Sequence, residues 1–264
     1  MTYEDIIVEA KESWIEITLN RPEKLNALRE KTAEELMQAL GEAESKREIR
    51  AVILQGGEKA FCTGLDTSEI KIEPGKQFDF YRFRKSAFKL PRFLRDLANY
   101  TKPVICAVEG YALGGGLEVA LLCDIIVAGE KAQFGLPEAR LGMVPAGGGT
   151  QTLPRLIGKP LAKELMWTGR RVSAEEAKSY RLVNHVVSAG KAIEKARELA
   201  KAIADNAPLA VMVSKAAIDR GVDMSLLDGI ATEADLSYLL YFSRDREEGL
   251  AAFREKRNPT FRGE

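Results

Sequence analysis

The feature that most constrains this chain is a short glycine-rich segment, GYALGGGLEVALLCD, at 110–124. Three consecutive glycines end a run of small residues, and Glu118 follows them at the start of an apolar segment. Glycine allows close approach of the backbone and φ values that are closed to other residues. A glycine loop that opens a helix presents unpaired N–H groups at the positive end of the helix dipole. Such N–H groups can bind an oxygen that becomes anionic during a reaction, with Glu118 beside it in the first turn.

Two further segments have a related pattern. FGLPEARLGMVPAGGGTQ, at 134–151, places Glu138 after a proline and ahead of another glycine loop. AFCTGLD, at 60–66, is interpreted as a loop after a buried strand, and its backbone could supply another N–H donor. Taken alone, the first segment also fits a close-packed structural loop, and Glu138 also fits a solvated turn residue.

Hydrophobic periodicity predicts the architecture. The N-terminal two thirds alternate strands and helices, and the chain after about residue 191 is helical, which favours an α/β fold with a helical C-terminal region. Ser173 and Glu176 fit a capping box. A long aromatic-rich helix is predicted at 77–100, bent near Pro91. Other predicted helices are 28–44, 192–204, 208–220, 225–241 and 245–257, and predicted strands are 6–10, 14–20, 49–57, 102–110 and 124–129.

Charge and composition exclude several partners. Lys and Arg number 39, as do Asp and Glu, so no basic excess calls for a nucleic acid. No apolar run is long enough to span a bilayer. The N-terminal segment MTYEDIIVEA lacks the basic region and the apolar region of a signal peptide. The three cysteines form no metal-type motif and indicate reduced thiols. We therefore expect a cytoplasmic protein with no membrane partner.

The single histidine narrows the possible chemistry. His185 lies in RLVNHVV, an alternating pattern that predicts a strand and a structural role. A histidine-dependent triad or a multi-histidine metal site then has little to be built from. If the protein is an enzyme, we expect its acid–base groups to be carboxylates, Lys, Tyr or Cys. Cys62 is interpreted as structural.

The glycine-rich and loop segments described above, together with the segments that flank them, occur in an order that resembles the crotonase (enoyl-CoA hydratase/isomerase) superfamily over essentially the whole chain. No single segment is specific, whereas their joint order and the pair Glu118 and Glu138 are. The resemblance runs through LNRPEKLNAL (19–28), AFCTGLD (60–66), KPVICAVEGYALGGGLEVALLCDIIVAG (102–129), AQFGLPEARLGMVPAGGGTQTLPRLIG (132–158) and EGLAAFREKR (248–257).

The resemblance implies a fold and an assembly. It implies a crotonase-type superhelix of ββα units, with a core at 1–200 that holds an acyl-CoA site. The helical region at 201–264 would serve oligomerisation and cover the active site. A homo-oligomer, either a trimer or a hexamer, is therefore expected.

The resemblance also implies an activity. The thioester carbonyl would lie between the backbone N–H groups of Leu65 and Gly115, where an enolate oxygen develops. Glu118 would activate water and Glu138 would protonate C2 in a syn-type hydration of a 2-enoyl-CoA to a 3-hydroxyacyl-CoA, a step of fatty acid metabolism. No cofactor or metal is expected, because coenzyme A is part of the substrate.

Further contacts to substrate and coenzyme A follow from the same resemblance. The residues are Lys24, Leu25, Ala27, Ala60, Asp66, Gly114, Phe253 and Lys256. From the residues alone, Asp66 also fits a helix cap near Thr67, and the last two also fit an amphipathic helix end. The aromatic residues within 70–100 suggest an aromatic or bulky acyl group.

Other activities remain open at this point. The same superfamily contains isomerases, decarboxylases and other lyases, and thioester hydrolases that act on acyl-CoA. Isomerases that use one glutamate fit less well, because both Glu118 and Glu138 are present. A non-catalytic, RNA-binding relative is a third possibility, against which the zero net charge argues.

Overall fold

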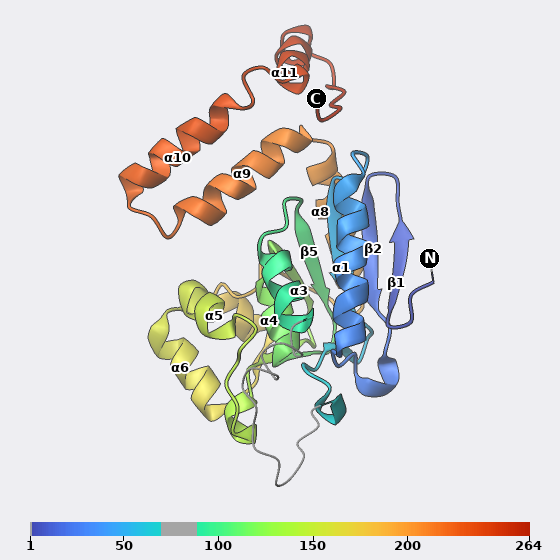
Figure 1. The fold of residues 1–264 in the computed structure, drawn as a ribbon, viewed down its shortest axis with the longest axis vertical. Helices are drawn as coiled ribbons and strands as arrows, with labels where there is room; N and C mark the ends of the chain where they lie inside the picture. Colours follow the sequence, from blue (N-terminus) through green and yellow to red (C-terminus); the bar gives the residue numbers. More distant parts are fainter. Residues whose placement is uncertain (1, 70–88) are drawn as a thin grey trace.

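Two sheets with helices around them form the core of the computed structural model, which describes residues 2–69 and 89–264 (Figure 1). The larger sheet has the order β1-β2-β3-β5-β7-β10, and the smaller has the order β4-β6-β8-β9. Three successive strand pairs, β3/β4, β5/β6 and β7/β8, each place their first strand in the larger sheet and their second in the smaller. The predicted superhelix of ββα units is confirmed.

The strands are β1 (Ile6–Ala10), β2 (Trp14–Leu19), β3 (Ala51–Gln55), β4 (Ala60–Cys62), β5 (Val104–Val108), β6 (Tyr111–Leu113), β7 (Ile125–Gly129), β8 (Gln133–Gly135), β9 (Val172–Ser173) and β10 (His185–Val187). The α-helices are α1 (Glu30–Ser45), α3 (Lys89–Ala98), α4 (Gly115–Leu121), α5 (Gly149–Ile157), α6 (Lys159–Thr168), α7 (Ala174–Ser179), α8 (Ala192–Ala204), α9 (Pro208–Gly221), α10 (Leu226–Tyr238) and α11 (Arg244–Glu255). Short 3₁₀ helices are η1 (Pro22–Lys24), η2 (Thr67–Glu69) and η3 (Glu138–Leu141).

Alternation along the buried strands separates two layers of core. In β3, Val52 and Leu54 face the side of the larger sheet that α1 and α3 cover. Ala51 and Ile53 face the opposite side, where α8 packs. This helix buries alanines at every fourth position, so its backbone lies close to the sheet. The boundary at residue 200, predicted between the core and the helical C-terminal region, falls inside α8.

The smaller sheet corrects one prediction. The segment 60–66 was interpreted as a loop, but its first residues form strand β4, which pairs in parallel with β6. In turn, β6 pairs in parallel with β8. These strands have only three residues each, which is too short for an alternating pattern to show in the sequence.

Most local predictions are confirmed. The Ser173 side chain accepts a hydrogen bond from the Glu176 N–H, and the Glu176 carboxylate accepts one from the Ser173 N–H, which completes the capping box. His185 lies in β10, as expected for a strand residue. Of the helix predicted at 77–100, the described part is α3, and residues 70–88 with their aromatic side chains lie outside the described residues.

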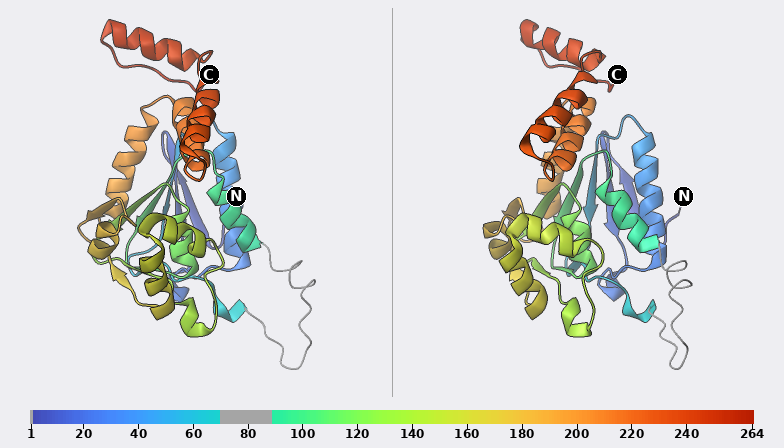
Figure 2. Two further views of the ribbon diagram at one scale, coloured as in Figure 1. Left: turned by 90° about the vertical axis from the view of Figure 1, so that its left-hand side faces the viewer. Right: turned by 60° about the vertical axis from the view of Figure 1, so that its left-hand side comes forward.

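The helices of the C-terminal region extend away from the core (Figure 2). Helices α9 and α10 run alongside each other as an antiparallel pair, with α11 beyond them. Both α9 and α10 lack a fully buried residue. Large apolar side chains are instead exposed on and after them, namely Ile218, Val222, Met224, Leu226, Leu227, Ile230, Tyr238, Leu239, Tyr241 and Phe242.

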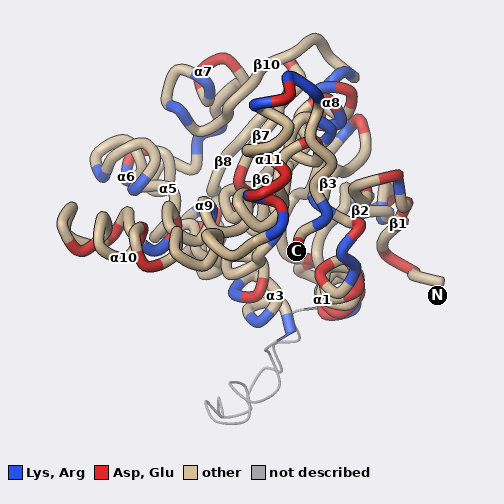
Figure 3. The backbone as a smooth tube through the Cα atoms, turned by 90° about the horizontal axis from the view of Figure 1, so that it is seen from above, with Lys and Arg blue, Asp and Glu red and all other residues tan. Residues whose placement is uncertain are grey.

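Charged residues are dispersed over the described chain. In the view of Figure 3, segments with Lys and Arg and segments with Asp and Glu are interspersed over the described chain, and they gather into no face of one sign there. Within the described residues, no helix combines the length and the apolar character that crossing a membrane requires.

Candidate active site

The candidate site lies where three neighbouring strands of the smaller sheet end. Strands β4, β6 and β8 run parallel, so their carboxyl ends meet at one edge. The segment after β4 contains Leu65, the segment after β6 contains Gly115 and Glu118, and the segment after β8 contains Glu138. The fold therefore brings together four residues that are spread over more than seventy positions of sequence. This edge is a common location of binding sites in parallel sheets.

Glycine is required at the turn that begins α4. Gly114 has φ +53° and Gly64, on the facing segment, has φ +100°, both in the region that favours glycine. A side-chain carbon at Gly116 would collide with the backbone of Cys62. One at Gly115 would lie 3.7 Å from the Leu65 nitrogen and 3.6 Å from Gly64 Cα. The loop after β4 and the start of α4 therefore pack directly against each other.

Two backbone N–H groups remain available at this contact. Gly115 is the first residue of α4, and the N–H of such a residue has no partner inside the helix. Leu65 forms a bridge with Leu28 in which Gly64 and Asp66 make the hydrogen bonds, so its own N–H faces the other way. Within the described residues, neither N–H donates a hydrogen bond. Both N–H groups are therefore free to donate to an oxygen atom of a ligand.

Glu118 lies in the first turn of α4 and is almost completely buried. Its Oε1 accepts hydrogen bonds from the backbone N–H groups of Gly147 and Gly149, at 2.7 and 2.8 Å. Burial raises the pKa of the Glu118 carboxyl group, and the two N–H donors oppose that rise. Among the described residues, Oε2 has no hydrogen-bond donor, so it can accept a proton from a substrate or a water molecule.

Glu138 begins η3, directly after Pro137. Burial raises the pKa of its carboxyl group, a hydrogen bond from its own backbone N–H opposes that rise, and the negative charge of Glu118 adds to it. Its Oε2 is buried and has no hydrogen-bond partner in the described chain. A side-chain carbon at Gly114 would lie 3.1 Å from its Oε1, so the carboxyl group packs against the glycine turn. A carboxyl group in such surroundings favours the protonated form.

The arrangement combines three chemical capacities at one place. The N–H groups of Leu65 and Gly115 can stabilise a developing oxyanion. Glu118 presents a fixed proton acceptor, and Glu138 is suited to hold and deliver a proton. Two neighbouring carboxyl groups in different environments are typical of acid–base pairs in enzymes.

The loop at 21–27 lies against the segment after β4. The Asn26 side chain donates a hydrogen bond to the Ala60 carbonyl at 2.9 Å, and the Leu25 carbonyl accepts one from the Thr63 N–H at 3.2 Å. Lys24 and Leu25 are exposed, whereas Ala27 and Ala60 are buried. The side chains of the first two are therefore accessible, whereas those of the latter two are not.

Asp66 and the C-terminal residues occupy different settings. The Asp66 carboxylate accepts hydrogen bonds from the Ser68 N–H and hydroxyl at 3.1 and 2.6 Å, which confirms it as a cap. Phe253 and Lys256 are exposed at the end of α11, which lies at the other end of the molecule from α4 (Figure 1). Within one chain the structure does not bring these two residues to the site.

Other titratable groups have structural settings. Burial raises the pKa of the Cys62 thiol to about 12, so it is not an activated nucleophile. The Asp124 carboxylate accepts from the Val104 N–H and from Lys215, and the Glu109 carboxylate accepts from the Ala192 N–H. Among the described residues, no cluster of three His, Cys, Asp or Glu side chains is arranged to hold a metal ion.

Sequence reasoning missed the donors that hold Glu118. The glycine loop at 147–149 was noted, but nothing in the sequence linked it to a residue about thirty positions earlier. It also missed Arg21, whose guanidinium group bonds to Asp66. The one sequence signal for these donors was the glycine loop after Glu138, because glycine allows the backbone to approach another group closely.

Comparisons with known proteins identify the family and the fold. The family described as enoyl-CoA hydratase/isomerase matches residues 9–264. The short-chain-enoyl-CoA hydratase of Clostridium acetobutylicum is 40% identical over 97% of both chains. The human mitochondrial enoyl-CoA hydratase domain-containing protein 2 is 42% identical, over 94% of this chain and 85% of its own. The crystal structure of an enoyl-CoA hydratase from Bacillus anthracis superimposes with a TM-score of 0.91 at 42% identity, over 99% of this chain and 100% of its own.

Proposed function

Because the chain belongs to the enoyl-CoA hydratase/isomerase family, we propose that it catalyses the reversible, syn-type hydration of a 2-enoyl-CoA to a 3-hydroxyacyl-CoA. The observation that carries the proposal is the presence of two buried glutamates, Glu118 and Glu138, beside two available N–H groups. Hydration needs a base for water and an acid for C2, and this pair supplies both.

The carbonyl oxygen of the thioester binds between the N–H groups of Leu65 and Gly115. When water attacks C3, electrons of the C2=C3 bond move toward C2 and the carbonyl, and negative charge grows on that oxygen. Donors already aimed at this oxygen stabilise the charge without reorganising during the step. The resulting enolate is the species that C2 protonation consumes.

Glu118 orients and deprotonates the water. Its Oε1 is fixed by Gly147 and Gly149, which leaves Oε2 to accept the water proton. Glu138 delivers its proton to C2 on the same face, and the C2–H and C3–O bonds replace the C2=C3 π bond. Afterwards Glu118 holds the proton taken from water and Glu138 is ionised, and exchange with solvent restores both. Dehydration runs through the same groups in reverse.

Turnover of crotonyl-CoA by the purified protein tests this function. We expect loss of the enoyl-thioester absorbance and formation of 3-hydroxybutyryl-CoA, identified by mass spectrometry. Parallel reactions with a 3-enoyl-CoA and with a thiol reagent measure double-bond migration and release of free coenzyme A. Migration or thiol release without formation of the hydroxyacyl product would move the protein to the isomerase or hydrolase branch.

The pH dependence follows from the two carboxyl groups. Burial raises the pKa of both Glu118 and Glu138, and hydration needs the first ionised and the second protonated. We therefore expect kcat/KM to fall on the acid side at a pH above the ordinary pKa of glutamate, and to fall again on the alkaline side as Glu138 loses its proton. The two limbs report pKa values of the pair, since the groups are coupled. A profile of kcat/KM that does not change with pH on either side would contradict the roles assigned to Glu118 and Glu138.

We also propose that the working form is a homo-oligomer, a trimer or a hexamer. The exposed apolar side chains of α9 and α10 support this, because monomeric proteins rarely expose so large an apolar surface. In such an assembly the 201–264 region would oligomerise the chains and bring Phe253 and Lys256 to the coenzyme A of a neighbouring copy. Light scattering on the purified protein measures its mass in solution.

A further inference from the structure

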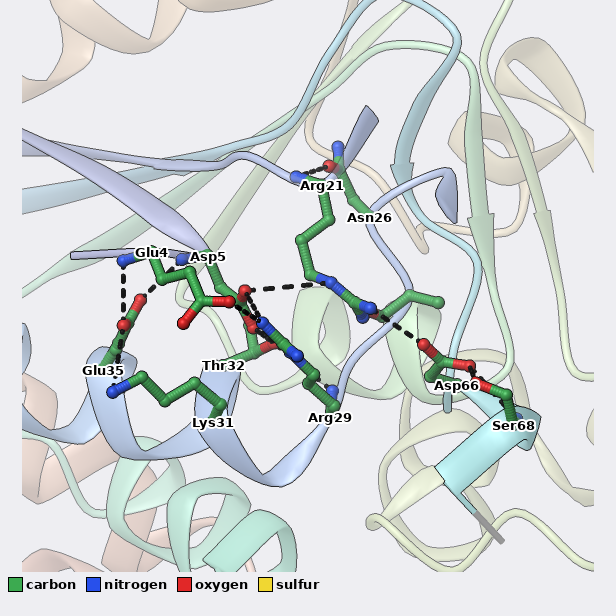
Figure 4. Close-up of polar contacts among 11 residues, drawn as sticks. Glu4, Asp5, Arg21, Asn26, Arg29, Lys31, Thr32, Glu35, Asp66 and Ser68 are labelled. Atoms are coloured by element: carbon green, nitrogen blue, oxygen red, sulfur yellow. Dashed lines mark hydrogen bonds and ion pairs between the residues drawn. The ribbon is translucent and has the colours of Figure 1, made fainter. Parts of the chain in front are cut away.

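Arg21 joins two segments that border the site (Figure 4). It follows β2 at the start of the 21–27 loop and is nine-tenths buried. Its Nη2 donates to Asp66 Oδ2 at 2.9 Å, and its Nη1 donates to the Ala27 carbonyl at 2.5 Å. One planar guanidinium group therefore holds the end of the 21–27 loop and the residue next to Leu65 at the same time.

Both carboxylate oxygens of Asp66 accept hydrogen bonds from protein groups. Oδ1 accepts from Ser68, and Oδ2 accepts from Arg21. These contacts with Ser68 and then Arg21 lower the pKa of the Asp66 carboxyl group to about 2, so it is ionised under all ordinary conditions. An ionised, buried carboxylate whose oxygens are both bonded inside the chain is poorly suited to bind a substrate through its side chain.

The remaining charges nearby have partners of their own. The Asp5 carboxylate accepts from Arg29 Nε and Nη2 at 2.8 and 2.7 Å and from the Thr32 hydroxyl at 2.6 Å. Arg21 Nε lies 3.8 Å from Asp5, a longer contact than the one to Asp66. Asp66 is therefore the main anionic partner of Arg21, and the network contains a second arginine, Arg29, with no contact to Asp66.

The Arg21–Asp66 pair bears on the direction of one N–H group. The bridge between Leu28 and Leu65 consists of the bonds from the Leu28 N–H to Gly64 at 2.7 Å and from the Asp66 N–H to Leu28 at 2.8 Å. Arg21 holds Ala27 on one side of this bridge and Asp66 on the other. Both contacts therefore adjoin the segment 64–66, whose Leu65 nitrogen lies next to the start of α4.

We propose that Arg21 and Asp66 form a positioning pair that sets the direction of the Leu65 N–H toward the thioester carbonyl, and that Asp66 acts in this way rather than by contact with the substrate. The proposal rests on the proposed function for the role of that N–H. It makes the carbonyl-binding geometry depend on the same guanidinium group that fixes the end of the 21–27 loop.

The test uses two conservative variants and one matched control. Arg21→Lys keeps the charge but replaces the rigid planar fork that spans Asp66 and Ala27 with a compact ammonium group, and Asp66→Asn keeps the shape but removes the charge. Arg29→Lys removes the same kind of planar fork from the same network without touching Asp66. For each protein we would measure kcat on crotonyl-CoA, the Kd for butyryl-CoA and the Tm.

We expect the two pair variants to lose kcat on the order of tenfold, because a misdirected donor loses part of the roughly 10²–10³ that a missing donor costs. The Kd for butyryl-CoA should change much less, and the double variant should be little worse than the worse single one. The Arg29→Lys variant should keep its kcat even where its Tm falls as far. An equal loss of kcat in that control would reduce the pair to a structural role and overturn the proposal.

A spectroscopic readout separates this proposal from the proposed function. Butyryl-CoA labelled with ¹³C at its carbonyl has no double bond to hydrate, and its infrared carbonyl band moves when N–H donors polarise it. We expect Asp66→Asn to return the band toward its position in water, and an unchanged band would refute the positioning role. A wild-type protein that polarises this band but does not hydrate crotonyl-CoA would refute the hydratase assignment alone.

Discussion

Turnover of crotonyl-CoA should fall by about 10²–10⁴-fold when either Glu118 or Glu138 is replaced by Gln, because each change removes one proton-transfer group. Glutamine matches the shape of glutamate, so the fold should be retained. In Glu118→Gln the amide oxygen can still accept from Gly147 and Gly149, but an NH₂ group then faces the water in place of an acceptor. In Glu138→Gln no internal bond to Oε2 is lost among the described residues.

Two further variants make this result specific. Glu109→Gln is the matched control, because its carboxylate bonds to the Ala192 N–H away from the site, and its turnover should stay near wild type. The double variant of the site pair should be scarcely worse than the single ones, since the two groups act as a unit. Full activity in either single variant would remove that glutamate from the mechanism.

The two roles can also be told apart. Glu138, acting in reverse, can take a proton from C2 of butyryl-CoA and return a deuteron in D₂O, with the enolate held by the two N–H groups. Exchange at C2, followed by mass spectrometry, should therefore survive in Glu118→Gln and disappear in Glu138→Gln. The opposite pattern would exchange the two assignments.

Removal of the Gly115 N–H should lower kcat by about 10²–10³-fold, the usual cost of one oxyanion donor. Gly115→Pro performs this removal at the first position of a helix, where proline's fixed φ is compatible and the N–H has no helical partner. A side-chain carbon at this residue meets only ordinary contacts, the nearest at 3.6 Å. The helix should therefore form, and the loss should appear in kcat on crotonyl-CoA.

Gly115→Ala is the control for this change. It adds the same first side-chain carbon but keeps the N–H, so its kcat should stay close to that of wild type. Tm values for both variants check that α4 is intact. If Ala proves as damaging as Pro, the crowding of the loop rather than the missing donor explains the effect, and Gly115 is not the donor.

The sequence predicted local features well and long-range contacts poorly. The start of α4 at the glycines and the Ser173 capping box were predicted because their signals lie within a few residues of each other. Strand β4 was missed because three residues cannot display an alternating pattern. The strand pairing that places it beside β6 joins segments about fifty positions apart.

The same distinction holds for the site. Glu118 and Glu138 were predicted as a pair, yet their different surroundings are created by contacts with Gly147, Gly149 and Gly114 that no local pattern encodes. Likewise, Asp66 was predicted as a cap from its neighbours, while its ion pair with Arg21 spans 45 positions. What a carboxyl group does depends on partners that only the fold supplies.

The order in which the smaller sheet is built has a consequence for how such sites diversify. Each successive ββα turn contributes one part: Leu65 from the first, Gly115 and Glu118 from the second, and Glu138 from the third. Both available N–H groups therefore come from turns that precede the one that carries Glu138. Under the proposed mechanism, exchanging only the loop after β8 for that of another protein would replace the proton donor and leave the two N–H groups in place. The residues proposed to hold the carbonyl oxygen and the residue proposed to donate the proton thus lie on separate turns of the fold.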